Sequence, residues 1–274
     1  LRTLSHMRSL TPWLPSSTLS LGWLNDMMGK HIAVWFSCGA ASAVAAKLTL
    51  GKYGADNKVS IINNPIAEEH GDNTRFLKDV EVWLGQEIIL ASHSKYPSNS
   101  CVEVWDERNY ISGPMGAPCT MILKKQARQQ WEALNKPDYT VLGFTSEEQD
   151  RADRFKLTER ETLLTPLIDA GYTKQDCFNV LADAGVELPA IYRLGYPNAN
   201  CIGCVKASSA TYWNLVRETF PDVFEERLEQ SRRIGTKLTY YKGKRIFLDE
   251  LPKDAKGRPL KDYDFDCGIF CEEK

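Results

Sequence analysis

Short apolar runs alternate with helix-like stretches over the first half of the chain, and this alternation limits the fold more than any other feature. The runs span 30–36, 58–64, 87–92 and 138–145, and they are rich in β-branched or aromatic residues. Between them, 72–85 has apolar residues spaced as on one helix face, and 117–135 predicts a helix with Pro118 in its first turn. Strands and helices that alternate at this spacing predict βαβ units. We therefore expect an α/β fold with a doubly wound, mostly parallel sheet and flanking helices.

Composition places the chain among soluble globular proteins. Of its 274 residues, 43% are hydrophobic and 26% are charged, which is enough apolar material for a sizeable core. No apolar stretch reaches the roughly 18 residues that span a bilayer, so no membrane partner is expected. The net charge of −2 argues against a global basic field for nucleic acid, but it leaves a local basic patch open. Eight cysteines without a visible secretory signal favour a cytoplasmic protein that uses its thiols for chemistry or metal.

The two ends of the chain differ in character from the middle. Residues 1–27 are rich in Ser, Leu and Arg with no acid before Asp26, which is typical of a transit peptide or of a misplaced start. We favour the misplaced start and leave 1–27 out of the fold. Residues 28–255 form the predicted α/β domain, whose later part is helical, with Thr173 as an N-cap and a break near Pro221. Residues 256–274 form a predicted mobile tail.

Cysteine spacing predicts a metal or cluster site. Cys201 and Cys204 form a CxxC behind a loop rich in Gly, Pro and Asn, where thiolates have the geometry of ligands. Further thiolates could come from Cys119, Cys267 and Cys271. Four thiolates can hold either a zinc ion or an iron–sulfur cluster. Cys101 and Cys177 each stand alone in their segments, so we interpret both as buried small hydrophobic residues.

Two further stretches have the residues of anion-binding loops. "SCGAAS" (37–42) follows the first predicted strand, and its small residues would expose backbone N–H groups at a helix N-terminus. The phosphate-binding residues predicted there are Ser37, Gly39 and Ser42, although tight helix packing also requires small residues. "GFTSEEQDRADRF" (143–155) follows a later strand, and its predicted anion ligands are Gln149, Arg151 and Arg154, the alternative being a solvated charged loop.

Taken together, these motifs resemble the phosphoadenosine phosphosulfate (PAPS) and adenosine phosphosulfate (APS) reductases of the adenine-nucleotide α-hydrolase-like superfamily. "IYRLGYPNANCIGC" (191–204) and "DCGIF" (266–270) are the most specific stretches, the second resembling the segment with the catalytic cysteine. "GAPCTMILKK" (116–125) lies where cluster-bearing members have two adjacent cysteines. The order agrees from about residue 30 to 271. The chain departs from the family in having Thr145 at an arginine position, and "INNPIAEEHGDN" (62–73) in place of Asp-Thr-Gly.

The resemblance implies thiol-dependent reduction of APS or PAPS to sulfite. Cys267 would be the catalytic nucleophile, forming a Cys-S-sulfonate that a thioredoxin- or glutaredoxin-like dithiol resolves. Lys124 and Lys125 would join the two arginines in binding the anionic substrate. A [4Fe–4S] cluster, with zinc as the alternative, would take the ligands Cys119, Cys201, Cys204 and Cys271.

Two other functions remain open from the sequence. The same fold supports ATP-dependent sulfur transfer to tRNA or DNA, including phosphorothioation, and only there would nucleic acid be a partner. Alternatively, Cys201, Cys204, Cys267 and Cys271 could form a structural zinc site in a nucleotide-binding module that is not an enzyme.

Overall fold

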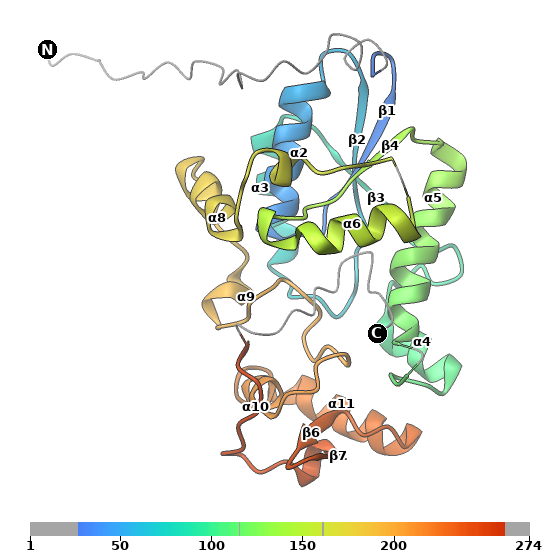
Figure 1. Ribbon diagram of the computed structural model, residues 1–274. Helices are drawn as coiled ribbons and strands as arrows, with labels where there is room; N and C mark the ends of the chain where they lie inside the picture. The colour runs from blue at the N-terminus through green and yellow to red at the C-terminus, as the bar shows by residue number, and fades with distance from the viewer. Residues whose placement is uncertain (1–26, 115, 161, 261–274) are drawn as a thin grey trace, which may run out of the picture.

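The fold centres on one parallel sheet. The computed structural model describes residues 27–114, 116–160 and 162–260. Its five-stranded sheet has the order β3-β2-β1-β4-β5, and every pairing is parallel (Figure 1). The strands are β1 (His31–Trp35), β2 (Lys58–Asn63), β3 (Ile88–Leu90), β4 (Tyr139–Val141) and β5 (Leu163–Leu164). The predicted doubly wound α/β fold is therefore confirmed.

Helices cover both faces of the sheet. Those of the first half are α2 (Ala40–Tyr53), α3 (Asn73–Leu84), α4 (Cys101–Arg108), the π-helical segment η1 (Thr120–Gln126) and α5 (Ala127–Asn135). A 3₁₀ turn η2 (Ser146–Glu148) leads into α6 (Gln149–Thr158), α7 (Pro166–Asp169), α8 (Lys174–Asp183) and α9 (Ala190–Arg193). The remaining elements are α10 (Ala210–Thr219), α11 (Pro221–Ile234), the hairpin β6 (Thr239–Tyr241) and β7 (Lys244–Ile246), and the 3₁₀ turn η3 (Leu248–Glu250).

Alternate residues of the central strand enter two different cores. Ile32 and Val34 pack with α2, α3 and α8, whereas Ala33 and Trp35 pack with α5 and α6. All four are buried, as expected of a parallel sheet with helices on both faces. The apolar runs of the sequence thus form strands that are covered on both sides.

A third core lies beyond the sheet and contains four of the six cysteines that the structure describes. It joins α4 and the start of η1 to α9, α10, α11 and the hairpin. Ile66 and Tyr96, from the chain that follows β2 and β3, also belong to it, so this core lies at the carboxyl ends of the strands. In Figure 1 these elements form the lower part of the molecule, below the sheet. None of the helices in the described part of the chain combines the length and apolar character needed to cross a membrane.

The observed elements differ from the predicted ones in a few places. Thr173 is the N-cap of α8, with a capping box to Asp176, and Pro221 separates α10 from α11, as predicted. The predicted helix 117–135 is helical from Pro118 to Asn135, but its segment Thr120–Gln126 is a π-helix. Sequence periodicity did not predict α4 or the β6–β7 hairpin, because both are short and polar on one side.

Candidate cysteine-lined active site

Four cysteine thiols line one cavity at the carboxyl end of the sheet. They are Cys101, Cys119, Cys201 and Cys204. The cavity is small, about 10 Å³, and apolar side chains of Ile66, Trp105 and Val205 form part of its wall. Its polar lining comes from Thr120, Lys124 and Lys206. The structure therefore brings together three predicted ligands and a fourth cysteine that the sequence did not single out.

Cys101 is the unpredicted member of this group. Its thiol neighbours those of Cys119 and Cys201, and hydrogen bonding to them together with burial raises the pKa of Cys101 well above its usual value. Cys101 is buried in a hydrophobic core, as predicted, but segments distant in sequence bring other thiols next to it. Cys177, by contrast, lies on α8 and packs into the sheet core, where burial raises its pKa to about 12.

Glu68 fixes the position of Cys101. Ser100 is the N-cap of α4, so the backbone N–H groups of Cys101 and Val102 have no partner within the helix. The Glu68 carboxylate accepts a hydrogen bond from each of them, at 2.8 and 3.3 Å, and another from the Ser100 hydroxyl at 2.7 Å. The backbone carbonyl of Glu68 also accepts the N–H of Ile202 at 2.8 Å. One residue thus ties the start of α4 to the CxxC loop.

Tyr212 forms hydrogen bonds to the backbone of the CxxC loop. Its buried hydroxyl accepts the backbone N–H of Cys204 at 2.8 Å and donates to the carbonyl of Cys201 at 3.4 Å. Burial raises the pKa of Tyr212 well above its usual value, so the hydroxyl keeps its proton and can do both. Gly203 lies between the two cysteines with φ +66°, and a Cβ there would come within 2.9 Å of Val223. A side chain at this position would therefore distort the loop.

Lys124 connects the cysteine cavity with the loop after β1. It is buried, and its ammonium lies 3.7 Å from a carboxylate oxygen of Glu69. The same two charges act on Cys38, whose pKa is raised mainly by burial and then by Glu69, with Lys124 opposing. Because Lys124 is already held in place, its ammonium can bind an anion in the cavity without the entropic cost of ordering a flexible side chain. Lys125 instead points to Glu159, 2.5 Å away, and does not line the cavity.

The "SCGAAS" loop follows β1, at the point where the order of the strands in the sheet reverses. Chain leaving β1 continues to β2 on one side, whereas β4 lies on the other, and ligands of doubly wound sheets bind at this crevice. The Ser42 hydroxyl accepts the Ser37 backbone N–H at 3.1 Å and donates to the Gly39 carbonyl at 2.9 Å. Gly39 caps α2 without a side-chain hydrogen bond. A Cβ at Gly39 would lie 3.6 Å from the Tyr192 hydroxyl, so two predicted motifs meet here.

The predicted anion ligands of α6 are engaged with nearby carboxylates. Gln149 donates to Asp153 at 2.8 Å, and the Arg151 guanidinium contacts Glu148 at 2.7 Å. Arg154 is an exposed residue of the same helix. Neither arginine lines the cysteine cavity. Cys267 and Cys271 lie outside the described residues.

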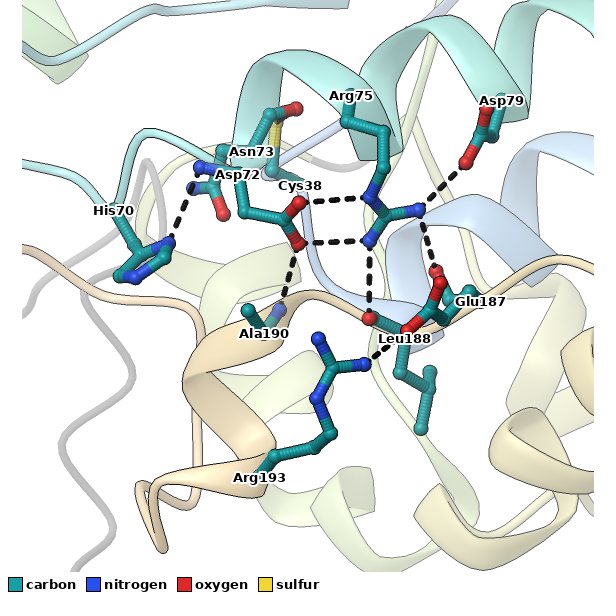
Figure 2. Close-up of polar contacts among 10 residues, drawn as sticks. All are labelled: Cys38, His70, Asp72, Asn73, Arg75, Asp79, Glu187, Leu188, Ala190 and Arg193. Atoms are coloured by element: carbon teal, nitrogen blue, oxygen red, sulfur yellow. Dashed lines mark hydrogen bonds and ion pairs between the residues drawn. The ribbon is translucent and has the colours of Figure 1, made fainter.

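The Arg75 guanidinium of α3 forms hydrogen bonds to the segment that leads to the CxxC motif. Figure 2 shows Arg75 facing the Asp72 carboxylate with two parallel hydrogen bonds, both 2.7 Å. Arg75 also donates to Asp79 and to the carbonyls of Glu187 and Leu188. The backbone N–H of Ala190 donates a hydrogen bond of 2.7 Å to the Asp72 carboxylate. These bonds fix the start of α9, eleven residues before Cys201 in the printed sequence.

Comparison with known proteins gives matches in structure only. No protein-family model matches the chain, and no curated protein is significantly similar to it in sequence. Among solved structures, it is similar to the PAPS reductase of Candida auris in its phosphate complex, with 10% identity, a TM-score of 0.46 and coverage of 66% of this chain and 85% of that one. It is also similar to the U34-tRNA thiolase NcsA of Methanococcus maripaludis with its [4Fe-4S] cluster, with 12% identity, a TM-score of 0.47 and coverage of 77% and 74%.

Proposed function

We propose that Cys101, Cys119, Cys201 and Cys204 hold a [4Fe–4S] cluster and that the protein reduces an adenine sulfonucleotide to sulfite. The observation that carries the cluster assignment is the convergence of four thiols, with no histidine or carboxylate among them, on one cavity. Thiolate sulfur is the usual ligand of iron–sulfur clusters.

We favour a cluster over a zinc ion because the motifs resemble those of reductases that include cluster-bearing members. A structural zinc needs its sulfurs within about 2.3 Å of a single point. Among the described residues, no three His, Cys, Asp or Glu side chains are arranged to hold one metal ion. Cys101 then replaces the tail residue Cys271 as the fourth ligand.

The residues of the cavity and of the neighbouring loop suit an anionic substrate. Lys124 is buried between Glu69 and the cavity, where it can receive the sulfate or phosphate oxygens. The loop from Ser37 to Ser42 can receive the rest of the nucleotide at the N-terminus of α2. In the proposed reaction the Cys267 thiolate attacks the substrate sulfur, the nucleotide leaves, and an external dithiol releases sulfite from the Cys-S-sulfonate. A bound cluster would supply a fixed charge distribution beside this site.

Iron and sulfide analysis of anaerobically purified protein tests the cluster. We expect about four irons and four sulfides per chain in the natural protein. Cys101→Ala should lose them as completely as Cys204→Ala does, whereas the matched control Cys177→Ala should keep them. Retention of iron by Cys101→Ala, with loss in Cys271→Ala, would overturn the ligand set. One zinc and no iron would overturn the cluster itself.

Turnover tests the reaction separately. With APS or PAPS and a thioredoxin-type dithiol, the iron-loaded protein should release sulfite, and Cys267→Ser should abolish release without loss of iron. Sulfite release by Cys267→Ser at the natural rate would refute the nucleophile, and an iron-loaded protein with neither substrate turned over would refute sulfonucleotide reduction.

A second candidate function is ATP-dependent sulfur transfer. The residues at the sulfonucleotide-binding positions of the crevice favour it, because they depart from those of the resembled reductases. Thr145 stands where the resembled reductases have arginine, and its backbone N–H and hydroxyl both bond to Glu148 within one turn. Asn63 and Asn64 end β2, and their amides donate to the carbonyls of Phe36 and Ala91 rather than facing the cavity. Release of AMP and pyrophosphate from ATP, in place of sulfite from APS or PAPS, would select this candidate.

A further inference from the structure

A buried guanidinium lies behind the wall of the cysteine cavity. Arg227 belongs to α11 and is only 2% exposed, although an arginine is almost never fully buried without close partners. Its guanidinium carbon lies 4.9 Å from the centre of the Trp105 ring, and Trp105 lines the cavity. The negative face of an indole ring attracts a cation placed over it. Arg227 and the cavity therefore share one aromatic side chain.

The side chains around Arg227 do not balance its charge. It forms an ion pair of 3.9 Å with Glu226, whose side chain is 65% exposed, so solvent screens the attraction. A nitrogen of the guanidinium donates to the Gln230 amide oxygen over a long 3.5 Å, and the Nε–H has no hydrogen-bond partner among the described residues. The Asp106 carboxylate accepts instead from Gln230 and Arg233, at 3.0 and 2.7 Å. A buried charge left in this way destabilises the fold unless a negative group lies nearby.

The same guanidinium lies against the CxxC loop. A Cβ added to Gly203 would come within 3.2 Å of Arg227 Cγ and 3.6 Å of its Nε. Gly203 follows Cys201 by two residues and directly precedes Cys204. Arg227 thus packs against the loop that carries two of the four thiols, as well as against Trp105. A negative group held by these thiols would be the nearby charge that Arg227 lacks.

Two uncharged donors of the cavity wall also have no partner among the described residues. They are the indole N–H of Trp105 and the hydroxyl of Thr120, and both atoms are buried. Trp105 follows Cys101 by one turn of α4, so the two share a helix face, and Thr120 directly follows Cys119. Buried donors without an acceptor are costly and therefore rare. Two of them beside the thiols indicate that the group bound in this cavity offers acceptor atoms.

We propose that Arg227 is the counter-charge of the group bound by the four thiolates, and that Trp105 and Thr120 donate hydrogen bonds to its sulfur atoms. This inference rests on the cluster proposed above. A [4Fe–4S]²⁺ core with four thiolates carries two negative charges, and one added electron makes three. A buried cation and hydrogen-bond donors stabilise the more negative form more strongly, so they raise the reduction potential of the cluster. None of the three side chains is a ligand, and each acts through the charge of the cluster.

The reduction potential of the iron-loaded protein tests the role of Arg227. Stepwise reduction with dithionite or europium(II), followed by electron paramagnetic resonance, gives the ratio of reduced to oxidised cluster. Arg227→Met removes the charge and should lower this ratio about tenfold at a fixed potential, which is about 59 mV for one electron. The matched control is Arg217→Met. Arg217 also stacks on an aromatic ring, that of Phe224 at 4.3 Å, but its guanidinium donates to the carbonyls of Leu248 and Leu251, so the ratio should stay unchanged.

Resonance Raman spectra of the oxidised protein test the hydrogen bonds without any reduction. Trp105→Phe keeps a ring beneath Arg227 and removes the N–H, so the iron–sulfur stretching bands should shift to higher frequency. Thr120→Val, which keeps the shape of the side chain, should shift them in the same direction. The matched control is Trp213→Phe, because the Trp213 N–H donates to the Ala207 carbonyl at 2.7 Å. This control should cost stability and leave the bands in place.

Each part of the inference can fail separately. An unchanged potential in Arg227→Met, an equal change in Arg217→Met, or a natural cluster that europium(II) does not reduce would overturn the counter-charge. Unshifted bands in both Trp105→Phe and Thr120→Val would overturn the hydrogen bonds. Iron analysis of the same samples distinguishes these failures from failure of the cluster. A natural protein without iron would overturn the cluster and this inference together, whereas iron-loaded variants with natural potentials and bands would overturn the inference alone.

Discussion

Single residues decide how firmly the cysteine-bearing loops are held. Arg75 donates five hydrogen bonds through its three guanidinium nitrogens, to two carboxylates and two backbone carbonyls. It joins α3 to the chain just before α9 (Figure 2). The bidentate bond to Arg75 holds the pKa of the Asp72 carboxyl at about 2, although burial alone would raise it. A lowered folded-state pKa makes this carboxylate a source of stability at neutral pH.

The Asp72→Asn substitution should reveal this contribution through its pH dependence. Above about pH 5, we expect the natural protein to exceed the variant by about 2 kcal/mol in free energy of unfolding. The difference should shrink as the pH falls from about 4 toward 2, because Asp72 then takes up a proton in the folded state too. Urea unfolding at a series of pH values measures it. Asp79→Asn, which removes a single and more exposed partner of Arg75, should have a smaller effect, and a difference that stays constant down to pH 2 would contradict the assignment.

At the scale of elements, the start of α4 is what places the fourth thiol. A short helix of eight residues has little stability of its own, and its first N–H groups depend on outside acceptors. Glu68 supplies them from the loop after β2, and a carboxylate near a helix N-terminus also interacts favourably with the helix dipole. The cavity therefore depends on a contact between two loops.

Replacing Glu68 by Ala should lower the free energy of unfolding by about 1–2 kcal/mol and should speed the loss of iron in air. A matched control is Asp176→Ala, which removes the carboxylate that accepts the Thr173 N–H at the start of α8 and does not line the cysteine cavity. The control should lose comparable stability but keep its iron. Denaturant unfolding and timed iron release compare the two variants, and equal iron release would show that Glu68 supports only the fold.

At the scale of the whole molecule, the structure contains two kinds of hydrophobic core. The sheet is covered by helices on both faces, whereas the core around α4, α10 and α11 contains the four thiols of the cavity. The proposed cluster would bind four residues from three separate segments and so add a further link between elements that already meet through packing and hydrogen bonds. Removal of the metal should therefore loosen this core more than the sheet.

Hydrogen–deuterium exchange should show this difference between iron-loaded and iron-free protein. Peptides that cover α4 and residues 199–216 should exchange faster after iron removal, while those from β1 and β2 should be unchanged. Uniform acceleration across the chain would indicate that the metal stabilises the whole fold, and no change anywhere would indicate that the cavity is rigid without it.

The sequence by itself determined the local elements, because their signals are local. The strands β1 to β4 followed from short β-rich runs, Thr173 from a capping residue, and the division at Pro221 from a residue without a backbone N–H. The α/β class followed from the order of these elements. The CxxC motif was equally visible, since both of its thiols lie within four consecutive residues.

Only the tertiary structure decided which thiols share a cavity. Cys101 lies far from its partners in sequence, and no periodic pattern specifies that the loop after β3 meets the loop before α10. Local patterns encode backbone conformation, but contacts between distant segments depend on the packing of the whole chain.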